Sequence, residues 1–92
     1  MIRSFVGKSA ERIWDGQYVK AIDRTVQRAA PRKLEMIHAA KDVDDLRIPP
    51  GNRLERLIGD RKGQLSIRVN DQWRICFVSD RGGEDVELVD YH

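Results

Sequence analysis

The chain has 92 residues, a charged fraction of 35% and a net charge of +2, so we expect a single folded domain over residues 1–92 with one modest core. It contains no apolar run long enough to cross a bilayer and no signal-peptide core, so we expect a cytoplasmic protein that does not bind membranes. The single cysteine, Cys76, excludes an internal disulfide and a multi-cysteine zinc site.

The first half of the chain has mainly helical patterns. Residues 2–5 predict a short strand, and residues 8–14 predict a short helix. Residues 18–40 also predict helix, because apolar side chains recur there every three or four residues. Pro31 interrupts this pattern, so we expect either a kink or a second helix that begins at Pro31. Residues 42–46 predict a turn or a short helical segment.

The second half of the chain has strand patterns separated by turns. The strand-like runs are residues 53–57, 65–69, 73–78 and 85–90, and the turns are residues 49–52, 59–63, 70–72 and 80–83. Helices that precede several strands predict an α+β domain. We expect two or three N-terminal helices packed on one face of an antiparallel sheet.

The segment 65–77 predicts a hairpin with two arginines directly opposite each other. If the loop is residues 70–72, Arg68 pairs with Arg74, and the apolar residues of both strands share the other face. Facing like charges are destabilising unless an anion lies between them, and guanidinium groups fit phosphate oxygens well. The pattern therefore predicts a phosphate-binding hairpin. The alternative is that each arginine pairs with a local carboxylate, such as Asp71 or Glu87.

The last three residues, Asp90, Tyr91 and His92, are an acid, a phenol and an imidazole. Cleavage of RNA without a metal needs a base, an acid and cations that stabilise the charged transition state. Together with Arg68 and Arg74, these residues could fill those roles. No cluster of metal ligands occurs in the sequence, so we expect neither a metal nor another cofactor. The alternative is a disordered tail.

Positive charge is concentrated around the hairpin. Residues 47–74 contain seven Lys or Arg against three Asp or Glu, a local excess that favours a polyanionic partner. Our candidate RNA-binding residues lie in this block: Arg53, Arg56, Arg61, Lys62, Asn70 and Gln72.

Several motifs resemble one known family. They are residues 59–63, 67–77 and 89–92, together with 1–5, 32–36 and 49–55. They resemble the HigB/GraT "killer protein" branch of the RelE/ParE toxin superfamily over essentially the whole chain. The resemblance implies a RelE-like fold and a toxin of a type II toxin–antitoxin system.

The resemblance also implies an activity and its partners. Such toxins enter the ribosomal A site and cut messenger RNA without a metal, leaving a 2′,3′-cyclic phosphate. The implied partner is a HigA/GraA-like helix-turn-helix antitoxin, through which alone the toxin would reach operator DNA. Arg68 and Arg74 would bind the scissile phosphate, and Asp90, Tyr91 and His92 would form the catalytic group, with acid and base left open.

Three positions depart from the family pattern. Ile58 stands where relatives often carry lysine, Glu55 stands where some carry a catalytic histidine, and Pro31 lies where relatives continue a helix. Losing a cation beside a phosphate weakens transition-state stabilisation, so we expect a weak toxin. Two other functions remain open: a non-catalytic ParE-like inhibitor of DNA gyrase, and a degenerate toxin that acts as co-repressor with its antitoxin. The terminal acid, phenol and imidazole favour the nuclease.

Overall fold

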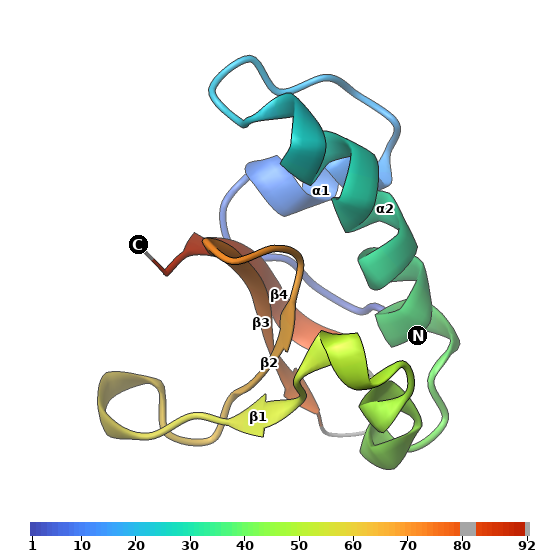
Figure 1. Ribbon diagram of the computed structural model, residues 1–92, viewed down its shortest axis with the longest axis vertical. Coiled ribbons are helices and arrows are strands. Elements are labelled where there is room, and N and C mark those ends of the chain that lie inside the picture. The colour runs from blue at the N-terminus through green and yellow to red at the C-terminus, as the bar shows by residue number, and fades with distance from the viewer. Residues whose placement is uncertain (80–82, 92) are drawn as a thin grey trace.

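The computed structural model describes residues 1–79 and 83–91, and it consists of helices packed on one face of a four-stranded sheet (Figure 1). The strands are antiparallel neighbours in chain order: β1 (Glu55–Arg56), β2 (Leu65–Arg68), β3 (Trp73–Ser79) and β4 (Gly83–Asp90). The predicted α+β architecture is confirmed. The turn expected at residues 80–83 lies outside the described residues except for Gly83, which begins β4. Within the described ranges, no helix is both long enough and apolar enough to cross a membrane.

Two helices form the layer above the sheet. Helix α1 (Ser9–Trp14) lies where the sequence predicts it, and α2 (Arg24–Ala39) is the main helix. The buried stripe of α2 joins the hydrophobic core with the inner face of the sheet: Val26, Ala30, Leu34 and Ile37. Helix α2 continues through Pro31, so a second helix beginning at that residue is a wrong prediction. Pro31 is exposed, and burial of the opposite stripe on both sides of it stabilises one continuous helix.

Helix α2 begins six residues later than the apolar spacing predicts. The Asp23 carboxylate caps it by accepting a hydrogen bond from the Thr25 backbone N–H at 2.7 Å. The preceding loop is held by the Gln27 side chain, which donates to the carbonyls of Val19 and Ile22 and accepts from the Val19 N–H, each at 2.7 Å. Val19 and Ile22 are therefore buried from a loop, so their helical spacing was misleading.

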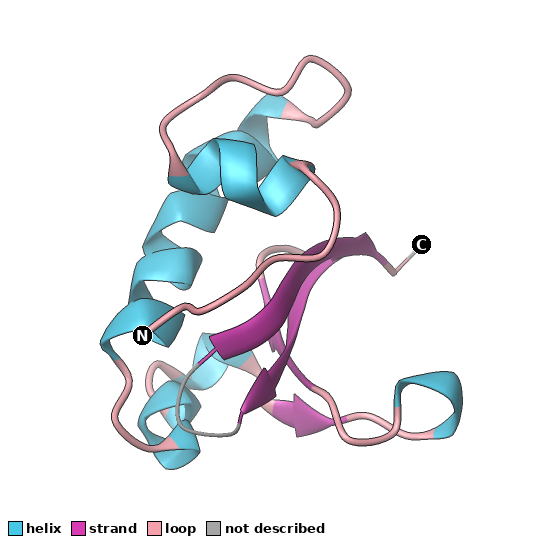
Figure 2. Cartoon of the chain, turned by 180° about the vertical axis from the view of Figure 1, so that it is seen from behind, coloured by secondary structure: helices cyan, strands magenta, loops and turns pink. Residues whose placement is uncertain are grey.

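The N-terminal segment runs along β4 (Figure 2) but does not form the predicted strand over residues 2–5. Among the described residues it forms only two parallel bridges, between Ile2 and Gly83 and between Phe5 and Val86. Between these bridges Asp85 has a left-handed φ of 50°, and its N–H bonds to the Ser4 hydroxyl at 2.8 Å instead of to a backbone carbonyl. This local conformation of β4 interrupts the ladder and explains why the strand prediction is wrong.

Short 3-10 helices replace part of the predicted loop and strand structure between α2 and β2. They are η1 (Val43–Arg47), η2 (Pro50–Asn52) and η3 (Gly59–Arg61). The helical segment expected at residues 42–46 is confirmed by η1. The strand expected at residues 53–57 is reduced to the two residues of β1, because Arg53 takes a left-handed φ of 47° that ends η2.

We predict that Gly83→Ala destabilises the protein. A Cβ at this buried position would lie 2.7 Å from Cγ2 of Ile37 on α2 and 3.2 Å from Cγ2 of Val86. Overpacking of this kind should lower the free energy of unfolding by about 1–3 kcal/mol, measured by chemical denaturation. Gly51→Ala is the control, since a Cβ there meets no atom within 4 Å and should leave stability nearly unchanged. Equal stability of the two variants would contradict the packing described here.

Candidate functional site

The β2–β3 hairpin has the predicted register. Arg68 lies opposite Arg74, Ile67 opposite Ile75, and Leu65 opposite Phe77. The hairpin closes with a hydrogen bond from the Val69 N–H to the Trp73 carbonyl at 2.9 Å. The Asn70 side-chain oxygen accepts hydrogen bonds from the backbone N–H groups of Gln72 (2.9 Å) and Trp73 (2.8 Å). Asn70 therefore shapes the loop that sets the arginines opposite each other.

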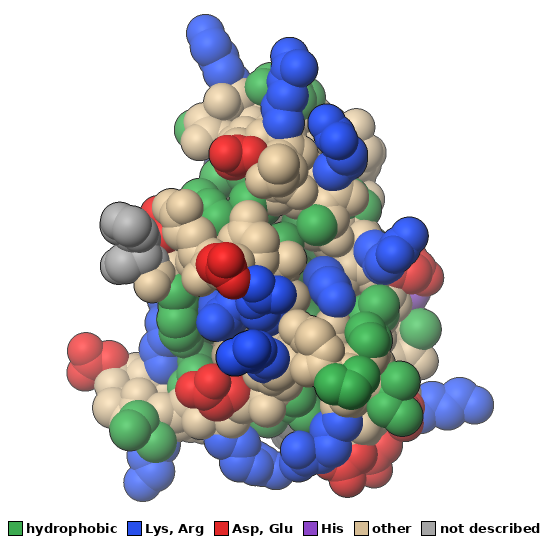
Figure 3. Space-filling model, viewed as in Figure 1, with side chains coloured by type: hydrophobic (Ala, Val, Ile, Leu, Met, Phe, Trp, Pro, Cys, Tyr) green, Lys and Arg blue, Asp and Glu red, His purple; other side chains and the backbone are tan. Residues whose placement is uncertain are grey.

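The two faces of this hairpin have opposite character. Because side chains alternate along a strand, the buried residues that pack toward α2 lie on the face away from the arginines. These buried residues are Leu65, Ile67, Ile75 and Phe77. Figure 3 shows Lys and Arg side chains gathered near the middle of the molecular face that Figure 1 presents. The core thus fixes which side of the sheet is cationic.

Each arginine has a local partner. Arg68 forms an ion pair with Asp71, whose side chain is 98% exposed. The Arg74 Nη1 donates to the Asn70 carbonyl at 2.9 Å, and its guanidinium carbon lies 5.7 Å from the centre of the Tyr91 ring. The carboxylate alternative is thus confirmed for Arg68 with Asp71, whereas Glu87 pairs with neither arginine. An ion pair with so exposed a carboxylate is weak, so a bound phosphate could replace it.

The end of β4 is held against the hairpin through Gln72. The Tyr91 N–H donates to the Gln72 carbonyl at 2.6 Å, and the Gln72 side-chain amide donates to Oδ2 of Asp90 at 3.1 Å. A disordered tail is therefore wrong for Asp90 and Tyr91, and the third member of the predicted group, His92, lies outside the described residues.

The sheet register separates the side chains of Asp90 and Tyr91. Asp90 lies opposite Trp73 in the ladder, and directly opposed residues share a face, so its carboxylate belongs to the side of the sheet that packs toward the helices. Tyr91 follows on the other side, where its ring contacts Arg74. The structure thus brings Tyr91 to Arg74, whereas Asp90 contacts Gln72 at the hairpin loop.

The Tyr91 phenol is protonated at neutral pH. Partial burial raises its pKa above the usual value, and a contact of 3.9 Å between its oxygen and Sγ of the buried Cys76 acts in the same direction, against the opposing charge of Arg61. A phenol with a raised pKa can donate a hydrogen bond or a proton, and it is a poor base at neutral pH.

An open cleft of about 470 Å³ lies between Tyr91 and the segment around η3. Its lining residues are Glu55, Arg56, Leu57, Ile58, Asp60, Arg61 and Tyr91. Nη1 of Arg61 donates to Oε1 of Glu87 at 3.1 Å and to Oε1 of Gln64 at 3.0 Å, and the bond to Glu87 is the main cause that raises the pKa of Arg61. Two departures from the family pattern, Glu55 and the 88% exposed Ile58, therefore line the same cleft as Tyr91.

The predicted RNA-binding residues divide into three groups. Arg56 and Arg61 line the cleft, while Asn70 and Gln72 shape the hairpin and hold the tail. Arg53 and Lys62 are exposed and do not line the cleft. The structure also shows basic residues that our sequence analysis missed: Arg28, Arg32 and Lys33 on α2. The sequence signal that could have revealed them is the four-residue spacing of two arginines, with a lysine directly after the second.

Comparison with known proteins agrees with this geometry. The family model of the HigB-like toxins, described as RelE-like toxins of the type II toxin–antitoxin system HigB, matches residues 3–92. Toxin HigB-1 of Vibrio cholerae serotype O1 is 45% identical over 78 residues, which cover 84% of this chain and 82% of that toxin. An uncharacterized protein of Haemophilus influenzae is 41% identical over 56 residues, covering 61% of this chain and 55% of that protein. The chain therefore belongs to the HigB-like toxins, the RelE-like toxins of type II toxin–antitoxin systems.

Proposed function

We propose that the chain is an endoribonuclease that cuts messenger RNA in the ribosomal A site without a metal. The observation that carries this proposal is the direct opposition of Arg68 and Arg74, with the protonated Tyr91 beside Arg74. Two guanidinium groups on one face of a rigid hairpin can hold the two non-bridging oxygens of one phosphate. Family membership supports the same activity.

Cleavage in this proposal is an internal transfer of the phosphate. The 2′-hydroxyl oxygen attacks the neighbouring phosphorus and loses its proton to a base. The bond from phosphorus to the 5′ oxygen breaks, and an acid protonates that oxygen, so the upstream fragment ends in a 2′,3′-cyclic phosphate. Extra negative charge develops on the phosphate oxygens during attack, where Arg68 and Arg74 stabilise it more strongly than in the ground state.

The residues at the chain end divide the remaining roles. Tyr91 retains its proton at neutral pH, so we assign it as a donor to the phosphate or to the leaving oxygen. Imidazole titrates near neutral pH, so we assign the base to His92 from its chemistry alone. Asp90, which is bonded to Gln72, would act by positioning the chain end.

A type II toxin has an antitoxin as partner. We propose that this antitoxin is a HigA/GraA-like helix-turn-helix protein and that the chain meets operator DNA only through it. We also propose weak activity, because Ile58 and Glu55 bring no cation to the cleft beside Tyr91.

We predict that Arg68→Ala and Arg74→Ala each lower cleavage by about 10²–10³-fold, since each removes a donor that stabilises the transition state. Primer extension on one message in a purified translation system, with and without ribosomes, measures this. Arg12→Ala removes the same charge from an exposed position on α1 and should cleave normally. Undiminished cleavage by the Arg74→Ala variant would contradict the proposed site. No cutting at all by well-folded unaltered protein would favour a gyrase inhibitor or a co-repressor.

We predict that Tyr91→Phe lowers cleavage by about 10²-fold, because the ring remains while the donating hydroxyl is lost. The pKa of Tyr91 is raised, so the phenol loses its proton only above its usual range of about 10. The pH profiles of cleavage by the unaltered protein and by the Tyr91→Phe variant should therefore have the same shape between about pH 6 and pH 9. An alkaline limb in that range that disappears in the variant would show that Tyr91 titrates there, against this assignment.

We predict that Ile58→Lys raises the cleavage rate by about tenfold, because it places a cation in the cleft near the developing charge. Initial rates of message cleavage at low and high salt measure the effect, which should shrink as salt rises. Ile48→Lys adds the same charge at a position that is 78% exposed and does not line the cleft. Equal rate increases in both variants would mean that net charge, and not the cleft, limits activity.

A further inference from the structure

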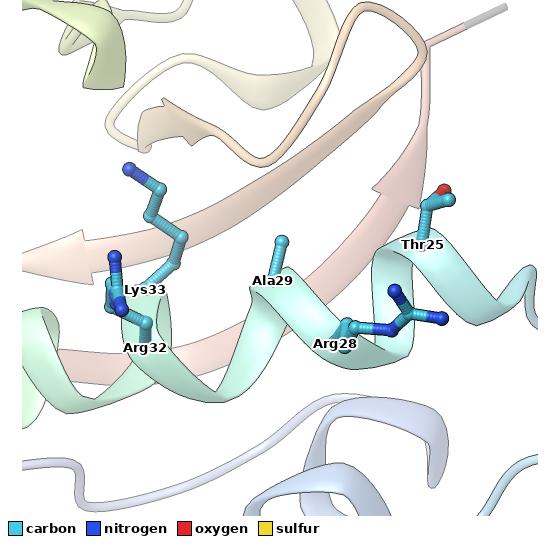
Figure 4. Close-up of a pocket in the computed structure, with 5 residues that line it drawn as sticks. All are labelled: Thr25, Arg28, Ala29, Arg32 and Lys33. Atoms are coloured by element: carbon cyan, nitrogen blue, oxygen red, sulfur yellow. The ribbon is translucent and has the colours of Figure 1, made fainter.

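A second basic site lies on α2, outside the site described above. It is a groove of about 510 Å³. Its lining residues are Thr25, Arg28, Ala29, Arg32 and Lys33 (Figure 4). Arg28 and Arg32 are one helical turn apart, as are Ala29 and Lys33, so two neighbouring rows of side chains form the groove. Figure 4 shows Lys33 extending from the helix toward the neighbouring strands.

The ammonium group of Lys33 is held in place by a neutral partner. Its Nζ donates to Oδ1 of Asn52 at 2.5 Å. Asn52 is fully buried, and its amide nitrogen is fixed by the Leu46 carbonyl at 3.1 Å. A neutral amide positions the lysine without cancelling its charge, so Lys33 remains available to an anion.

No ion pair between described residues joins a carboxylate to the cations of the groove. The described residues form three ion pairs, and none of these includes Arg28, Arg32 or Lys33. Burial lowers the pKa of Lys33, and the charges of Arg32 and Arg68 lower it further. Lys33 therefore feels the charge of a predicted phosphate ligand, Arg68. Together with the direction of Lys33 in Figure 4, this places the Lys33 end of the groove toward the sheet.

We propose that this groove binds a backbone phosphate of the same RNA strand whose scissile phosphate lies between Arg68 and Arg74. The inference rests on the proposed nuclease function and extends it to a second contact along the strand. A protein segment is a poorer fit, because tight protein interfaces need large apolar anchors, and among the described lining residues Ala29 is the only apolar side chain. Closely spaced cations without an apolar anchor suit a phosphodiester backbone.

The test is the salt dependence of RNA binding. A short, fully 2′-O-methylated single strand cannot be cleaved, and fluorescence anisotropy over a range of salt concentrations gives its affinity. We expect Arg28→Gln combined with Arg32→Gln to reduce the slope of log affinity against log salt by about 0.7 for each lost contact. Affinity at low salt should fall about tenfold. Arg3→Gln combined with Arg12→Gln removes the same charge from exposed positions outside the groove and should keep the full slope.

Other results overturn the inference in distinguishable ways. In one such result, the groove variant and its control have equal slopes, while Arg68→Gln combined with Arg74→Gln has a reduced slope. The proposed nuclease site would then be retained, and the groove would not contact the RNA. A reduced slope for the groove variant alone would overturn the proposed nuclease site, and with it the shared strand. Absence of RNA binding by the unaltered protein would overturn the inference together with the RNA-binding site on which it rests.

Discussion

The antiparallel register of β2 and β3 is the constraint on which the rest of the site depends. Ile67 and Ile75 lie opposite each other in the buried core, so a slip of one residue would move a row of apolar side chains out of that core. The same register sets Arg68 against Arg74, an arrangement that is unfavourable by itself. Hydrophobic burial on one face therefore stabilises a charge arrangement on the other face that electrostatics alone would oppose.

The groups that contact Arg68 and Arg74 either are uncharged or could be displaced by a bound phosphate. Asp71 is almost wholly exposed on a turn, while Arg74 contacts a carbonyl and an aromatic ring. Glu87, a partly buried carboxylate of the neighbouring strand β4, forms an ion pair with Arg61 instead. This distribution leaves the hairpin cationic while it fastens the segment around η3 to β4. Arg61 also lines the cleft beside Tyr91.

Local rules were sufficient for the hairpin and insufficient for contacts made over long sequence distances. The alternation of apolar and polar side chains in residues 65–77 and a three-residue loop determine the opposition of Arg68 and Arg74. This pair of arginines was therefore predictable from the sequence. The late start of α2 depends on the Gln27 side chain, and the missing N-terminal strand depends on the backbone of Asp85. Neither has a periodic signal. The basic groove of α2 was missed because its relation to Arg68 exists only in the folded chain.

The placement of residues 1–6 along β4 has a consequence for how this toxin meets other chains. Backbone groups of this segment bond to those of Gly83 and Val86, so much of that sheet border is already covered from within. The opposite border is β1, which is only two residues long. Sheet borders this short or covered resist edge-to-edge aggregation and give a partner little room to add a strand of its own. Residues 1–6 and the shortness of β1 therefore limit how far another chain can extend the sheet at either border.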